Sequence, residues 1–103
     1  MYRYTTPTLP VTIEDIDFSL VNNFRIAIEQ KGKEDKLLIV SASDGRVDAE
    51  NKTIYLSLMQ EETADFNEGE AKLQVRIVYA NGSVQATRKA RIAINDVIDE
   101  VIV

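Results

Sequence analysis

The chain has 103 residues, a net charge of −5 at pH 7, and neither cysteine nor histidine. This length suits one domain that buries a core without disulfides or metals. The acidic balance disfavours binding to phosphate backbones and anionic membrane surfaces, and no stretch approaches the ~20 apolar residues that span a bilayer. We therefore expect a single domain over residues 1–103 that binds neither nucleic acid nor membrane.

The first ten residues, MYRYTTPTLP, predict an extended arm over residues 1–10, because proline fixes its own backbone and favours extended geometry in the residue before it. They lack the apolar core of a secretory signal, so we expect the chain to stay in the cytoplasm where it is made. The following VTIEDIDFSL changes its alternation midway, which predicts a bend near Glu14 and Asp15. The apolar sets on either side of the bend are Val11 and Ile13, then Ile16, Phe18 and Leu20.

Three segments between residues 22 and 58 predict strands. NNFRIAIEQ and TIYLSL alternate apolar and polar residues, as half-buried strands do. The apolar faces are Phe24, Ile26 and Ile28 in the first segment, and Ile54, Leu56 and Leu58 in the second. LLIVSAS is rich in β-branched residues and predicts a strand buried on both faces, whereas DGRVDAENK predicts a loop.

After Leu58 the strand period stops, and residues 60–66 predict a short helical turn. Its apolar face would consist of Met59, Thr63 and Phe66. Glu61 and Glu62 would lie in the first turn, where the helix dipole favours carboxylates. The acidic stretch therefore reads as a helical corner that joins two strands.

The segment VYANGSVQ predicts a hairpin, because Asn-Gly between alternating runs favours a two-residue type I′ turn. In that register Ile77 faces Ala86 and Leu73 faces Ala90, so apolar residues meet on one face. The same register places Arg88 on the apolar face, and a bulge near Thr87 and Arg88 would correct this.

About seven short strands, regular turn signals and one helical corner predict an all-β fold, an immunoglobulin-like two-sheet sandwich. An acidic and apolar segment, NDVIDEVIV, follows the last predicted strand over residues 95–103.

The sequence offers no recognisable catalytic motif. Histidine, the commonest general base, is absent, and there is no nucleophile motif or glycine-rich phosphate loop. DFNEG departs from the calcium-loop pattern because its glycine comes one position early and Arg76 stands where the closing glutamate belongs. We expect no catalytic residue, no cofactor and no metal site, and an enzyme built on the scattered carboxylates is the least favoured alternative.

Four motifs resemble a family of small phage and prophage proteins of Gram-positive bacteria, often encoded among tail or baseplate structural genes. They are YRYTTPT, QEETADF, the strand QVRI and the ending DEVI. The family carries a capping threonine where this chain has Met59. The resemblance implies an immunoglobulin-like or baseplate-type domain, no catalysis, and residence in the host cytoplasm during assembly and then in the virion or phage-like particle.

These observations favour a structural protein that binds other phage structural proteins, or itself. The candidate interface residues are Tyr2, Tyr4, Val101, Ile102 and Val103. Residues 101–103 would either pair with a neighbour's sheet edge or complete this chain's own sandwich. The alternative is a soluble ligand- or carbohydrate-binding β-sandwich module, which the absence of tryptophan disfavours.

Overall fold

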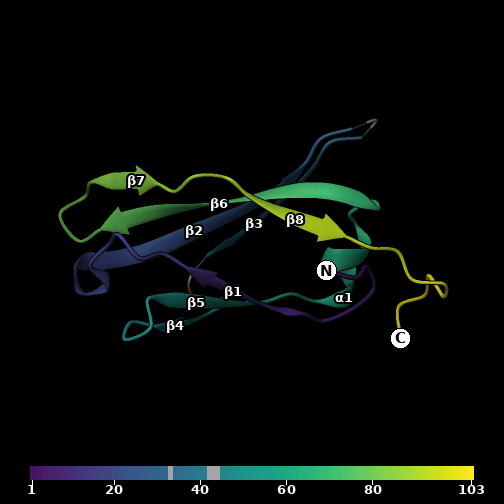
Figure 1. Ribbon diagram of the computed structural model, residues 1–103, viewed down its shortest axis with the longest axis horizontal. Helices are drawn as coiled ribbons and strands as arrows, with labels where there is room; N and C mark the ends of the chain where they lie inside the picture. Colours follow the sequence, from purple (N-terminus) through teal and green to yellow (C-terminus); the bar gives the residue numbers. More distant parts are fainter. Residues whose placement is uncertain (33, 42–44) are drawn as a thin grey trace.

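The computed structural model describes residues 1–32, 34–41 and 45–103, which form two antiparallel sheets and little helix (Figure 1). In the three-stranded sheet the order is β1 (Thr8–Thr12), β5 (Thr53–Ser57) and β4 (Gly45–Asp48). The five-stranded sheet has the order β3 (Lys36–Ser41), β2 (Val21–Gln30), β6 (Gly69–Tyr79) and β7 (Val84–Ala86), and β8 (Ala90–Ile94) also pairs with β6. The prediction of a mostly-β, two-sheet protein is confirmed.

The core lies between the two sheets and is built by the predicted alternation. Buried residues recur at every second position of β2 and β6, since successive side chains of a strand point to opposite faces, and β5 buries Ile54 and Leu56 together with Thr53. Both sheets contribute fully buried side chains, among them Ile26, Ile54, Leu56 and Val75. Within the described part of the chain, no helix has the length and apolar character needed to cross a membrane.

The helical corner is present but shorter than predicted, as α1 covers Gln60–Ala64. Thr63 and Phe66 are buried, as expected, but Met59 is 59% exposed, so its predicted place on the same helical face was wrong. Met59 has extended backbone angles and precedes the helix as its N-cap, and its side chain makes no capping hydrogen bond. The Glu62 carboxylate instead accepts a hydrogen bond of 2.8 Å from the Met59 backbone N–H.

The predicted hairpin forms, but its turn is one residue longer than a type I′ turn. Gly82 has a φ of +89°, whereas Asn81 is not among the residues with positive φ. The Gly82 N–H donates to the Tyr79 carbonyl, and the Tyr79 N–H donates to the Ser83 carbonyl, each at 2.9 Å. This is the pattern of a type I turn closed by a glycine bulge.

The longer turn shifts the register of β7 by one residue, so Ala86 pairs with Arg76 instead of Ile77. The predicted bulge then restores the register, since Leu73 pairs with Ala90 as expected. At the bulge Thr87 stays attached to β6: its N–H donates to the Val75 carbonyl at 2.9 Å, and its Oγ1 accepts from the Val75 N–H at 3.0 Å.

Two strand predictions were wrong because tertiary pairing decides them. β3 is not buried on both faces: it forms an edge of its sheet, with Leu37 63% and Ile39 42% exposed. The segment predicted as a loop contains β4, which pairs with β5 in spite of its weak strand propensity. Asp44 of that segment lies outside the described residues. The bend near Glu14 and Asp15 is confirmed as a turn that leads into a 3-10 helix, η1 (Phe18–Leu20).

Candidate functional site

The first residues are held against the end of β8 instead of extending as a free arm. Tyr2 forms a parallel bridge with Asn95. The Arg3 N–H donates to the Asn95 carbonyl at 2.9 Å, and the Asn95 N–H donates to the Met1 carbonyl at 2.8 Å. The predicted arm, residues 1–10, therefore splits into a short extended piece beside β8 and the beginning of β1.

Arg3 joins this piece to α1 and to the residues after β8. Its Nη2 donates to the Ala64 carbonyl at 2.9 Å, and its Nε donates to the Phe66 carbonyl. Carbonyls at the end of a helix lack partners within the helix, so a guanidinium there satisfies them. The Arg3 side chain is only 14% exposed, so these contacts stabilise the fold more than those of a surface arginine.

The same guanidinium binds two carboxylates. Arg3 Nη1 lies 2.7 Å from Asp96 Oδ1 and 3.3 Å from Glu100 Oε1. The hydrogen bond from Arg3 favours the charged form of Asp96 and lowers the pKa of that carboxyl below its ordinary value. Its bond to Asp96 likewise raises the pKa of Arg3.

Residues 96–103, the exposed segment, leave β8 and turn back towards α1 (Figure 1). Gln60 holds the far end in two hydrogen bonds, since its Nε2 donates to the Val103 carbonyl at 2.8 Å and its Oε1 accepts from the Val103 N–H at 2.9 Å. Between these anchors the segment forms no strand, and its apolar side chains face solvent except for the half-buried Val97. The exposed apolar residues are Ile98, Val101, Ile102 and Val103.

The structure brings the predicted interface residues to one end of the sandwich. Tyr2 is exposed beside Asn95, while Tyr4 is half-buried with its ring centroid 5.2 Å from the guanidinium carbon of Arg3. The other three, Val101, Ile102 and Val103, lie in the exposed segment, which Gln60 and Glu100 connect to the same end. The sequence did not lead us to predict a role for Arg3 or Gln60. The available signal for Arg3 was a basic residue placed between two tyrosines.

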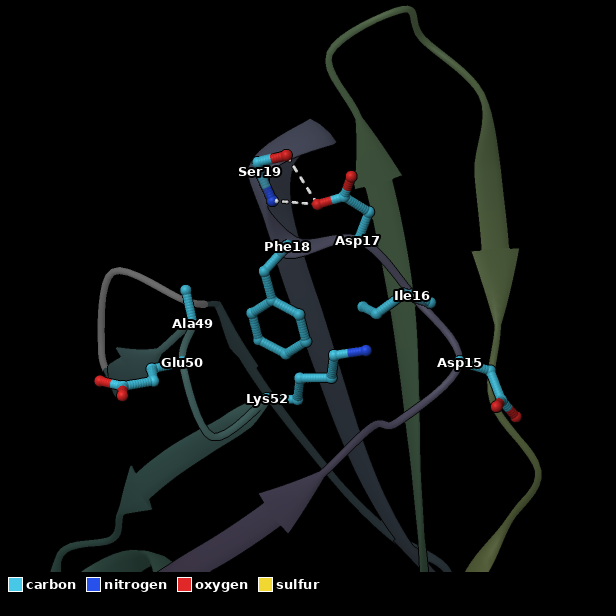
Figure 2. Close-up of a pocket in the computed structure, with 8 residues that line it drawn as sticks. All are labelled: Asp15, Ile16, Asp17, Phe18, Ser19, Ala49, Glu50 and Lys52. Carbon is cyan, nitrogen blue, oxygen red and sulfur yellow. Dashed lines mark hydrogen bonds between the residues drawn. The ribbon is translucent and has the colours of Figure 1, made fainter.

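A second candidate site is a hollow of about 530 Å³ beside η1, at the end of the sandwich away from α1 (Figures 1 and 2). The Phe18 ring lies in the middle of it, near the Lys52 side chain, whereas the Asp15 and Glu50 carboxylates point outwards (Figure 2). The Asp17 carboxylate is engaged in capping η1, accepting from Ser19 N at 3.0 Å and Ser19 Oγ at 2.6 Å.

These bonds from Ser19 hold the pKa of Asp17 below its ordinary value. The Lys52 ammonium is also engaged, since it donates to the Glu14 carbonyl at 2.9 Å. The charged groups inside the hollow thus stabilise the local turn, and Phe18, Asp15 and Glu50 remain to contact a ligand.

Among the described residues, no three carboxylate side chains gather closely enough to hold a metal ion. Comparison with protein-family models, with curated proteins and with solved structures finds no match to this chain. The protein is therefore small and mostly β, with two sheets, an exposed apolar segment at one end and a shallow hollow at the other.

Proposed function

We propose that this chain is a non-catalytic structural or assembly protein of a phage or prophage particle, acting in the tail or baseplate region. It works through contacts with other structural proteins or with copies of itself. The observation that carries the proposal is the exposed segment, whose apolar residues are presented to solvent on a defined scaffold. Exposed apolar surface of this kind is typical of protein–protein contact sites. The motif resemblance supplies the particle as the setting.

The scaffold favours binding because it limits the freedom of the exposed segment before a partner arrives. Arg3 holds its beginning through Asp96 and Glu100, and Gln60 holds Val103. A segment that is already held loses less conformational entropy on binding, so more of the contact energy appears as affinity. A second contact region is the β3 edge, where an added strand could pair with the backbone next to Leu37 and Ile39.

We further propose that the sandwich is immunoglobulin-like. The order β1-β5-β4 corresponds to strands B, E and D of such a fold, and the order β3-β2-β6 with β7 and β8 corresponds to C′, C, F and G. The parallel bridge between Tyr2 and Asn95 supports the assignment, since the chain start runs beside the last strand.

The test is mass spectrometry of purified phage-like particles, collected after prophage induction of the cell that encodes this chain. The proposal expects the protein in fixed stoichiometry with known particle components. Expression in the cytoplasm together with absence from the particles would refute a structural role in them.

The alternative function is carbohydrate binding, and the hollow beside η1 is the observation that favours it. The Phe18 ring offers a stacking surface within the hollow, and the Asp15 and Glu50 carboxylates at its rim offer hydrogen-bond acceptors (Figure 2). Glycan-array binding by the wild-type protein that Phe18→Ala abolishes, with the fold retained in circular dichroism, would support this function. The absence of binding by the folded wild type would exclude it for the sugars on the array.

A further inference from the structure

Like charges oppose each other on the outer face of the five-stranded sheet. Arg25 on β2 lies directly across from Arg76 on β6, and Lys72 on β6 lies directly across from Arg91 on β8. Opposite positions of an antiparallel pair share one face, and like charges placed there destabilise the sheet. Four of the basic side chains of this acidic protein therefore lie in two repulsive pairs.

The two pairs differ in how far neighbouring residues relieve them. Arg91 Nε lies 3.8 Å from a Glu70 oxygen, and Lys72 has Glu29 across from it on β2. In residues 1–32, 34–41 and 45–103, by contrast, neither Arg25 nor Arg76 forms an ion pair. Both are exposed, so solvent and salt screen the repulsion between them, and no carboxylate of the described residues pairs with either.

Polar and apolar side chains flank these two arginines: Ser41 lies across from Arg25 on β3, and Asn23 and Gln74 lie in the adjoining rows of the face. The next row of the same face towards β3 contains Ala27 and the exposed Ile39, which are paired across the strands. On the other side lies the exposed Val84, paired with Val78. We call Arg25 and Arg76 with these apolar neighbours the basic face. It would suit a ligand that presents carboxylates between aliphatic side chains.

The exposed segment has this composition. Asp99 and Glu100 stand between Ile98 and Val101, and all four side chains are exposed. Asp99 forms no ion pair with any described residue, and Glu100 shares Arg3 with Asp96 at the longer distance of 3.3 Å. The segment is held at the α1 end by Gln60, and Asp99 is exposed there.

We propose that the basic face of one copy binds the exposed segment of a second copy. The inference rests on the proposed structural role and names one partner within it. The contact joins two different surfaces, so it either closes in a two-fold dimer, in which each copy binds the other's segment, or repeats from copy to copy in a ring or a filament. With a net charge of −5, copies repel each other in most orientations, and pairing the basic face with Asp99 and Glu100 gives an attractive one. Guanidinium groups bind carboxylates in two parallel hydrogen bonds, which fixes the orientation.

The experiment is sedimentation velocity of the full chain over a range of protein and salt concentrations. The wild type is expected to show a mass that rises with protein concentration and falls with added salt, since screening weakens the contact. Arg76→Glu is expected to raise the apparent dissociation constant by about tenfold or more. Its thermal midpoint should not fall, because the change removes the repulsion with Arg25. Lys31→Glu is the matched control, with the same change of charge at an exposed site, and should leave association unchanged.

A second pair of variants separates this interface from others. Asp99→Lys should also weaken self-association, and combining it with Arg76→Glu in one chain should regain part of it, because the exchanged pair attracts while Arg25 and Glu100 keep their charges. A wild type that stays monomeric at its highest soluble concentration in low salt would overturn the inference. So would failure of the double variant to regain association. Binding of a labelled DNA duplex that Arg76→Glu abolishes would also overturn it and assign the face to phosphate. A monomeric protein found in particles would refute this inference while leaving the structural role standing.

Discussion

Replacing Arg3 by alanine tests the claim that one side chain holds three segments together. The change removes charge-assisted hydrogen bonds to the Ala64 and Phe66 carbonyls and to Asp96. A hydrogen bond to a charged group contributes about 1.5–3 kcal/mol, and water reaches the freed carbonyls only in part. Because the guanidinium is 14% exposed and its partners partly solvated, we expect a total loss of about 2–4 kcal/mol in the free energy of unfolding.

Urea unfolding followed by circular dichroism measures this loss directly, and the thermal midpoint should fall by roughly 10–20 °C for a domain of this size. The control is Lys31→Ala, which removes ion pairs of 3.6 Å to Glu29 and Asp35 from a side chain that is 67% exposed. Such surface pairs contribute less than about 1 kcal/mol. Equal losses in the two variants would refute the special role of Arg3. Arg3→Ala should also speed amide exchange in residues 96–103, and unchanged exchange there would refute the same role.

Three further variants test other parts of the structure. Phe66→Ala empties a fully buried site and should cost about 3–5 kcal/mol in urea unfolding, while a loss below that of the control substitution would show that Phe66 is not in the core. Met59→Thr places a capping hydroxyl at the N-cap of α1, where the present side chain makes no capping bond, and should raise the free energy of unfolding by about 0.5–1 kcal/mol, whereas a decrease would contradict the helix boundary. The lowered pKa of Asp96 stabilises the folded state above the ordinary pKa of 3.8, and this stability is lost as the pH falls through the lower pKa of the folded state. Asp96→Asn should therefore make the free energy of unfolding fall less steeply with decreasing pH. An unchanged slope would refute the pairing with Arg3.

The sequence predicted the features that depend on alternation and local chemistry. The buried face of β2 and the helical corner follow from periodicity, because each strand face and helix face repeats at a fixed spacing. The bulge at Thr87 was predicted because Arg88 could not lie on the apolar face. The strand face and the corner depend only on which side chains can be buried, whereas the bulge also depended on the hairpin register that Asn81 and Gly82 predict.

The features that the sequence did not predict depend on long-range pairing. The two exposed residues of β3 are as apolar as core residues, and only the position of the strand at a sheet edge exposes them. The opposition of Arg25 and Arg76 requires the register between β2 and β6, which no local pattern determines. The contacts of Arg3 join residues about sixty and ninety positions apart, which places them beyond any motif.

The central claim is that this protein acts through contacts made by its exposed segment. The most direct measurement is particle assembly in an inducible prophage that encodes the chain with Ile98→Ser and Val101→Ser, scored by electron microscopy and by the protein content of the particles. Serine at exposed positions should leave the fold intact, and Leu20→Ser with Val47→Ser, two exposed apolar residues outside every proposed contact surface, provides a comparison of equal size. The account predicts defective particles that lack the variant protein. Normal particles containing the variant in wild-type amount would contradict it.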